Sequence, residues 1–266
     1  MRQPNDYSLT GRAEQHIATV SSLASYLQAI NRHVDGGTKF LFRGQREEQW
    51  VLKPSIARHP RVWADTEQAM LREFKERAIP HLESTVDLGD ADWLAIAQHH
   101  NMPTRLLDWS GSALAALWFA IHQPAAPSKG RRRAPDAAVW ILRYTGQDLI
   151  RDYERADALS VERTPLLKPR HVSRRIAAQD GWFSLHRAHA NDAGISFVSL
   201  DSNQAYKDRL HYVRIPARAF GRMRTELKIA GVSRAVLFPD LEGVAGVVTA
   251  MHLYPDDEIP ARLGSL

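Results

Sequence analysis

Residues 98–122 read QHHNMPTRLLDWSGSALAALWFAIH, so polar side chains stand directly before an apolar segment. His99 could act as a general acid or base, and Arg105 could bind a phosphate through forked hydrogen bonds. Asp108 could orient a ribose hydroxyl. Polar groups that lose water at the start of a helix are costly unless they are paired. The stretch therefore predicts either a binding site or a buried hydrogen-bond network where a strand meets a helix.

Arg105 and Asp108 are three positions apart, and in a turn their side chains could meet. One interpretation is an internal salt bridge that fixes the corner between strand and helix. The other is a site in which Arg105 holds a phosphate and Asp108 a ribose. Both interpretations stay open at this point.

The two adjacent histidines differ in their expected surroundings. His100 continues the apolar stripe of Trp93, Ile96 and Ala97, so we expect it in the core. His99 lies off that stripe and could face the corner as a catalytic residue. None of the 12 histidines stands in a metal-ligand spacing, so the sequence predicts no metal site.

Two serines and a tryptophan follow the corner. Ser110 or Ser112 is expected to cap the helix that begins near Ala113, and the same helix N-terminus could also hold an anion. Trp109 could stack on a nucleobase or nicotinamide, or it could simply pack in the core.

A second polar group ends the apolar run FLFRGQ. Gly44 permits close approach of the backbone to a ligand, and Arg43 could grip a pyrophosphate. Gln45 belongs to the same candidate binding group. The alternative is a structural Arg43 that is paired with a carboxylate such as Asp108.

Hydrophobic periodicity indicates the elements that must position these residues. Helices are expected at 21–31, 65–80, 90–101, 113–122, 217–231 and 240–254. Strands are expected at 38–45, 50–55, 136–144, 181–186, 194–200 and 210–216. Because the strands are short and do not alternate regularly with helices, the pattern favours an α+β fold with a mixed, short-stranded sheet core flanked by helices.

The bulk composition limits the classes of protein. The chain has 266 residues, 44% of them apolar, and no cysteine, which excludes disulfides, a thiol nucleophile and cysteine zinc sites. We expect one domain at 18–254, a loop or insertion at 146–170, a flexible N-terminus at 1–17 and a tail at 255–266. No apolar run could span a membrane and no leader is evident, so we expect a cytoplasmic protein without a membrane partner. The oligomeric state is not indicated.

The charge balance allows a polyanionic partner. The net charge is +5, and cations cluster at 130–133 and 217–228. Such runs usually form a solvated face, and contact with nucleic acid is the alternative.

Five segments together resemble the FRG domain, a bacterial family named after its Phe-Arg-Gly signature. They are FLFRGQ, QHHNMPTRLLDWS, ALWFAIH, AAQDGWFSLH and LFPDLEGVA. The signature here is Phe42, Arg43 and Gly44, and the resemblance extends over about 38–250. His100 and Ser110 stand where the family often has Tyr and Thr.

The order of FLFRG and RLLDWSGSALAALWFA is also similar to that of mono-ADP-ribosyltransferases, at the level of the fold. This similarity implies an ADP-ribosyltransferase-like fold, NAD as a substrate, a nucleic-acid or protein acceptor, and a toxin or phage-defence role. The residues that would bind NAD are Arg43, Gly44, Gln45, Arg105, Trp109 and Ser110. The catalytic group would be His99, Asp108 and Gln179.

Gln179 stands where such an enzyme presents a catalytic Glu on a late strand. Loss of nicotinamide passes through an oxocarbenium-like state that a carboxylate stabilises, and an amide carries no charge. Asp180, Glu226 or Asp108 would then have to supply the carboxylate. Otherwise the chain is a non-catalytic module that binds a nucleotide or a nucleic acid.

Overall fold

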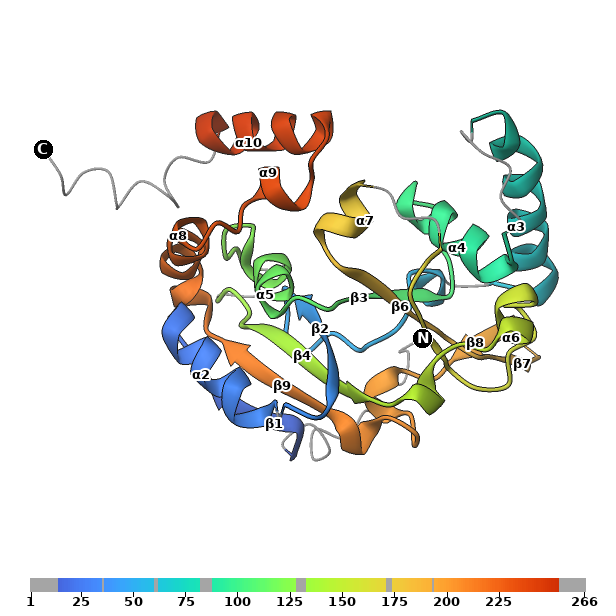
Figure 1. The fold of residues 1–266 in the computed structure, drawn as a ribbon, viewed down its shortest axis with the longest axis horizontal. Coiled ribbons are helices and arrows are strands. Elements are labelled where there is room, and N and C mark those ends of the chain that lie inside the picture. Colours follow the sequence, from blue (N-terminus) through green and yellow to red (C-terminus); the bar gives the residue numbers. More distant parts are fainter. Residues whose placement is uncertain are drawn as a thin grey trace, which may run out of the picture. The chain divides into compact units, whose positions relative to one another are not determined.

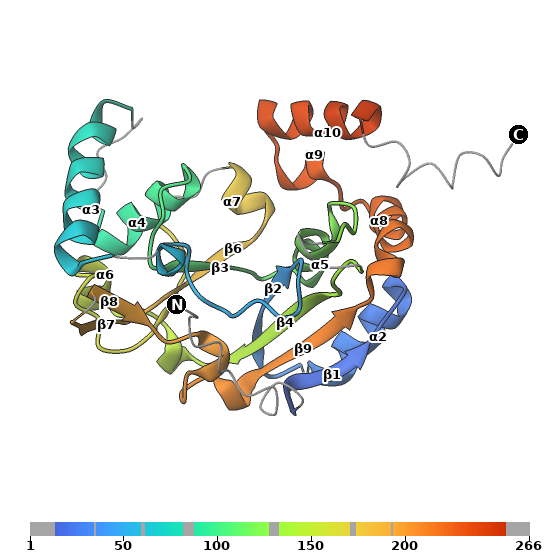
Figure 2. The same cartoon turned by 180° about the vertical axis from the view of Figure 1, so that it is seen from behind.

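The computed structural model describes residues 14–34, 36–59, 62–81, 88–127, 133–170, 174–192 and 194–253 (Figures 1 and 2). The chain divides into two compact units. Unit 1 comprises Met1–Trp50, Ser112–Arg143 and Asp208–Leu266, and unit 2 comprises Val51–Gly111 and Tyr144–Lys207. The expected tail at 255–266 and most of the expected flexible N-terminus lie outside the described residues.

Unit 1 is built on a sheet with the strand order β1-β9-β4-β2. Its strands are β1 (His16–Thr19), β2 (Lys39–Gln45), β4 (Ala137–Tyr144) and β9 (Leu210–Ile215). The β1–β9 pair is parallel and the β4–β9 pair is antiparallel, so the sheet is mixed. Strand β4 is buried from Ala137 to Leu142 and therefore reads as a nearly continuous apolar run.

The helices of unit 1 cover this sheet with apolar side chains. They are α2 (Leu23–His33), α5 (Ala113–Ile121), α8 (Phe220–Ile229), α9 (Arg234–Leu237) and α10 (Leu241–Leu253), with the 3-10 turn η6 (Ala217–Ala219) before α8. Phe42, Leu117, Ile141 and Met223 belong to one buried cluster, which joins β2, α5, β4 and α8. This core fixes where β2 ends relative to the end of α5.

Unit 2 holds an antiparallel sheet of β3 (Leu106–Ser110), β6 (Gly181–Leu185) and β5 (Leu166–Leu167). A hairpin of β7 (Ala188–Asn191) and β8 (Gly194–Phe197) accompanies it. The helices are α3 (Ala64–Ala78), α4 (Asp90–His99), α6 (Asp152–Ala156) and α7 (Arg174–Ala178), with the 3-10 turns η1 (Ile56–Arg58), η2 (Ile79–His81), η3 (Gly146–Asp148) and η4 (Leu200–Ser202). Leu94, Leu106 and Phe183 lie in its core.

The α+β fold class and nearly all of the expected elements are confirmed. The expected strand at 50–55 is wrong, because Leu52 N–H donates to the Asp201 carboxylate (3.2 Å) and Pro54 has no N–H to pair. The segment 146–170 contains η3, α6 and β5. Among the described residues, no helix is long and apolar enough to cross a membrane.

The starts of two helices differ in how they are capped. Helix α3 begins after Trp63, which makes no side-chain cap, and Asp65 lies in its first turn. Ser112 rather than Ser110 caps α5, since its hydroxyl accepts a hydrogen bond from the Ala115 N–H (3.2 Å).

Gly44 lies where β2 touches α5. A Cβ atom at this position would lie 2.0 Å from the carbonyl oxygen of Ala116 and 2.6 Å from the nitrogen of Ala120. Both are backbone atoms of a helix, and they cannot move away as a side chain could. The glycine is therefore required for contact between strand and helix.

We predict that Gly44→Ala lowers the free energy of unfolding by about 3 kcal/mol, the upper end of the usual cost of overpacking. Urea unfolding followed by circular dichroism measures it. Gly37→Ala is the matched control, because nothing lies within 4 Å of the Cβ it would add. Equal stability of the two variants would contradict this account of Gly44.

Candidate functional site

In unit 2, the side chain of Gln98 on α4 forms hydrogen bonds with both Thr104 and Asp108. Its side-chain oxygen accepts a hydrogen bond from the Thr104 hydroxyl (2.5 Å), and its amide nitrogen donates to the Asp108 carboxylate (2.8 Å). Asp108 is therefore held by Gln98, a residue that the sequence analysis did not single out. No pattern in the sequence indicates this pair, since both side chains are polar and lie on separate elements.

The burial of the two adjacent histidines differs from the expectation for His100. His99 is half-buried at the end of α4, whereas His100 is exposed, so the predicted core position of His100 is wrong. The helix ends there, and Asn101 takes a left-handed conformation with φ 66°, which turns the chain away from the apolar face. The two rings meet edge to face at 5.1 Å.

Arg105 is one half of a buried ion pair. Only 3% of its side chain is exposed, and the same holds for Glu67 on α3. The guanidinium donates to both carboxylate oxygens of Glu67 (2.8 and 2.5 Å) and to the Leu159 carbonyl (2.9 Å). The structural interpretation of Arg105 thus finds a partner, but that partner is Glu67 rather than Asp108.

Trp109 and Ser110 attach β3 to its neighbour. The buried Trp109 ring donates its N–H to the Ser184 hydroxyl (3.1 Å), and the Ser110 hydroxyl donates to the Gln179 carbonyl (2.6 Å). Trp109 is packed inside unit 2, as in the second interpretation given for it.

Gln179 lies in the turn between α7 and β6, not on a strand, so the expectation of a strand position is wrong. Its neighbour Asp180 has a left-handed backbone with φ 42°, which is unfavourable for a residue other than glycine. The Asp180 carbonyl accepts from the Gly111 N–H (2.9 Å), and a Cβ at Gly111 would lie 1.9 Å from the Asp180 carboxylate. That carboxylate is held over the end of β3.

Asp180 also contacts a cation and remains accessible. Lys168 donates to its carboxylate at 3.0 Å, and the Asp180 side chain is still 47% exposed. The Lys168 ammonium lies 5.5 Å from the centre of the Trp182 ring. Glu226, by contrast, is used at the start of α2, where it accepts from the Leu23 N–H. Of the acids considered in place of Gln179, Asp180 is the one beside it.

Arg43, Gly44 and Gln45 belong to unit 1, while the other six predicted site residues belong to unit 2. Gln45 is buried, and its side-chain oxygen accepts a hydrogen bond from the Trp140 ring (2.8 Å). Arg43 is half-buried on β2. Within unit 2, the Gln179 carbonyl is hydrogen-bonded to Ser110, whereas the Asp108 carboxylate is hydrogen-bonded to Gln98.

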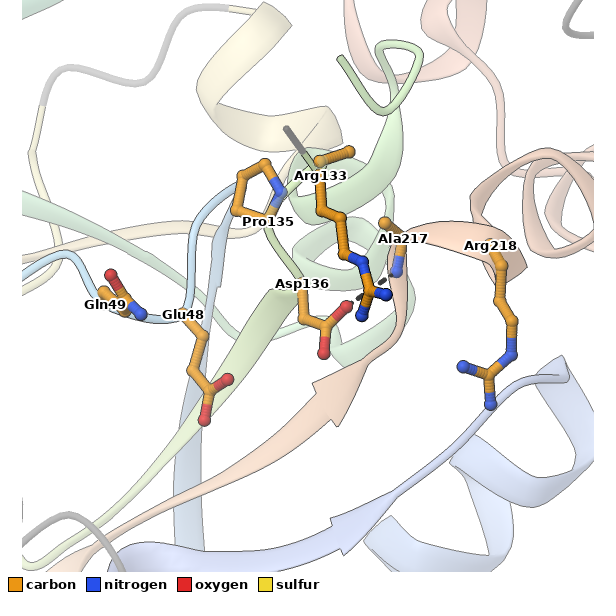
Figure 3. A pocket seen from close by; sticks show the side chains of 8 residues that line it. Glu48, Gln49, Arg133, Pro135, Asp136, Ala217 and Arg218 are labelled. Atoms are coloured by element: carbon orange, nitrogen blue, oxygen red, sulfur yellow. Dashed lines mark hydrogen bonds between the residues drawn. The ribbon is translucent and has the colours of Figure 1, made fainter. Parts of the chain in front are cut away.

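A pocket of about 520 Å³ lies in unit 1, where β2 ends, β4 begins and β9 leads into η6 (Figure 3). It is lined by Glu48, Gln49, Arg133, Ala134, Pro135, Asp136, Ala217 and Arg218. Arg133 and Arg218 come from the two basic segments of the sequence. In the view of Figure 3, Asp136 lies between Glu48 and the two guanidinium groups.

The carboxylates of this pocket already accept hydrogen bonds from the protein. Glu48 accepts from Arg214 (2.8 and 2.6 Å) and from the Tyr212 hydroxyl (2.7 Å). Burial alone would raise the pKa of Glu48, but the hydrogen bonds from Arg214 and Tyr212 outweigh it and lower that pKa, so Glu48 is ionised at neutral pH. Asp136 accepts from the Ala217 N–H (3.0 Å).

The two lining arginines differ from these carboxylates. Across the part of the chain that the structure describes, neither Arg133 nor Arg218 has an ion pair or a hydrogen bond. Within the same ranges, no group of three or more His, Asp or Glu side chains has an arrangement that could hold a metal ion. Arg133 and Arg218 therefore keep their hydrogen-bonding capacity for a ligand, which favours an anionic one.

Residues 38–129 match the family described as the FRG domain. Comparisons with curated proteins and with solved structures each found no match. The FRG segment contains β2, α3, α4, β3 and α5. The similarity to ADP-ribosyltransferases gains no support from these comparisons and stays a prediction.

We predict that Arg105→Met lowers the free energy of unfolding by about 3–5 kcal/mol, because Glu67 is left as a buried, unpaired charge. The double variant Arg105→Met with Glu67→Met should recover most of this loss. Urea unfolding of the three proteins measures both effects. An Arg105→Met protein of normal stability would contradict the structural role.

Proposed function

We propose that this FRG-domain protein binds a nucleotide through its phosphate and sugar groups in the pocket of unit 1. The observation that carries the proposal is the pair Arg133 and Arg218, two cations without a partner among the described residues that line one cavity. A planar guanidinium forms forked, charge-assisted bonds to phosphate oxygens. The net charge of +5 supports the approach of such an anion.

The other lining groups suit the rest of a nucleotide. The oxygens of Glu48 and Asp136 are acceptors, as the hydroxyl groups of a ribose require. The volume of about 520 Å³ lies within the range that is usual for small-molecule sites. A pocket that offers both cations and acceptors favours a phosphate–sugar compound over a simple inorganic anion.

We predict that Arg133→Gln and Arg218→Gln each weaken nucleotide binding about tenfold or more, since a lost hydrogen bond to a charged group costs about 1.5–3 kcal/mol. Isothermal titration with ATP, NAD and inorganic phosphate tests it. Lys228→Gln removes an exposed charge from α8 and is the matched control. Unchanged affinities in the two arginine variants, or no binding of any of the three compounds, would refute the pocket.

A second candidate function is the transfer of ADP-ribose from NAD, and the position of Asp180 beside Gln179 favours it. In this reaction the bond between nicotinamide and ribose breaks, and nicotinamide leaves with the electron pair. The acceptor nucleophile then bonds to the ribose carbon and gives up its proton. The Asp180 carboxylate would stabilise the cationic sugar between these events, and a toxin or phage-defence role would agree with such an activity.

For this second function we predict that the protein releases nicotinamide from labelled NAD. Asp180→Asn should lower the rate about 10²–10³-fold, because one charge-stabilising group is lost. Asp157→Asn changes an exposed aspartate of the same unit and is the control. Absence of nicotinamide release, or full activity of Asp180→Asn, would exclude this role for Asp180.

A further inference from the structure

Arginines gather at the C-terminal end of α5 in unit 1. Arg224 on α8 is buried and donates to the carbonyls of Ile121 (2.9 Å) and Gln123 (3.1 Å). It thereby satisfies carbonyls that the end of a helix leaves open, and its charge suits the negative end of the helix dipole. The role of Arg224 is accounted for by the fold.

His122 stands at the same helix end. Its ring stacks on Trp118 at 4.5 Å, and its Nδ1 bonds the Phe119 carbonyl (3.1 Å). Burial lowers the pKa of His122 to about 4, and the nearby charges of Arg46, Arg234 and Arg224 lower it as well, although the bond to Phe119 acts against them. His122 is thus neutral at pH 7. Arg234 lies close by, since its guanidinium is 5.3 Å from the centre of the Phe238 ring, which in turn is 5.7 Å from the Trp118 ring.

Arg46 and Arg234 are cations beyond what the helix end requires. Arg46 directly follows β2 and is two positions after Gly44, so it lies on the same face of the chain, the one toward α5. It is half-buried, and it has no ion pair or hydrogen bond among the described residues. The Nε atom of Arg234 is buried without a hydrogen-bond partner in the described chain. The nearest carboxylate recorded for Arg234 is that of Glu242, at 4.0 Å.

The cation cluster formed by Arg46 and Arg234 lies near the proposed nucleotide pocket, as two segments of the chain indicate. Arg46 precedes the pocket residue Glu48 by two positions, a reach of at most about 7 Å along the chain. The pocket residue Arg218 lies in η6, directly before α8, whose Arg224 binds the carbonyls on either side of His122. Neighbouring phosphates of one nucleic-acid strand could therefore meet both groups of arginines.

We infer that the physiological ligand is a single strand of nucleic acid, with one nucleotide in the pocket of unit 1 and an adjoining phosphate at Arg46 and Arg234. The inference rests on the proposed function of the pocket. A single strand is favoured over a duplex because its flexible backbone can place one phosphate and its sugar inside a concave pocket, whereas the stiff backbone of a duplex cannot bend into it. Stacking side chains are not needed for this contact, which is carried by charge.

The test measures the binding of fluorescein-labelled ten-residue single strands of DNA and RNA by anisotropy over a range of salt concentrations. A hairpin duplex and unlabelled ATP are compared with them. We expect the single strands to bind at least tenfold tighter than ATP. The double variant Arg46→Gln with Arg234→Gln should weaken strand binding and reduce the slope of log K against log salt by about 0.7, since one phosphate contact to a single strand is lost.

The variants separate the inference from the proposed function. Arg46→Gln with Arg234→Gln should leave ATP affinity unchanged, whereas the pocket variants Arg133→Gln and Arg218→Gln should weaken both ligands. The control removes two exposed charges elsewhere, by Arg77→Gln and Lys228→Gln. Strand binding no tighter than that of ATP, duplex binding as tight as that of the strand, or full strand binding by Arg46→Gln with Arg234→Gln would overturn the inference while nucleotide binding stands.

A second readout does not depend on a folded variant. Histidine NMR of the unaltered protein follows the titration of His122 with and without the strand. A phosphate at Arg46 and Arg234 should raise the pKa of His122 on the order of one unit, because an anion offsets the cations, and ATP should not. An unmoved pKa with the strand bound would place its phosphates elsewhere. Failure of both ATP and the strand to bind would instead refute the pocket itself.

Discussion

A buried guanidinium must find an acceptor for each of its N–H groups, and in unit 2 Arg105 finds them on separate segments of the chain. Glu67 comes from α3, and the carbonyls of Ala158 and Leu159 follow α6. Because an unpaired charge at this depth would cost several kcal/mol, these segments are held against the start of β3. Strand β3 begins directly after Arg105 and carries Asp108, and its far end at Ser110 pairs with Gly181, the residue after Asp180.

The same physical rule separates structural charges from binding charges in unit 1. Glu48 forms an ion pair with Arg214 beside the pocket, and it also accepts a hydrogen bond from the Tyr212 hydroxyl. Arg133 and Arg218 line the same pocket without such partners in the described chain. Matched charges of this kind contribute to specificity of the fold, whereas unmatched ones keep their capacity for a ligand. This contrast, rather than the number of arginines, is what marks the pocket.

The apolar segments of the sequence were enough to predict β2, α4 and α5, because each contributes several buried apolar side chains to a core. The roles of individual polar residues were not predictable in the same way. Nothing in the sequence joins Arg105 to Glu67, which lies 38 positions upstream and reads as one more surface charge of an amphipathic helix. Gly44 shows the same limit, since a glycine beside a ligand and a glycine beside a helix look identical in the sequence. The basic segments did carry a signal, but only the fold shows that Arg133 and Arg218 share a cavity.

Two of the three residues of the Phe-Arg-Gly signature have structural roles. Phe42 is buried in the core of unit 1, and Gly44 makes room for the backbone of α5. The matched segment ends at residue 129, whereas Arg133, Asp136 and Arg218 lie beyond it. The FRG segment therefore supplies Glu48 and Gln49, which follow β2, and later parts of the chain supply most of the charged lining of the pocket. Two chains could share the signature and still bind different ligands, because the charges that would select the ligand lie outside the matched segment.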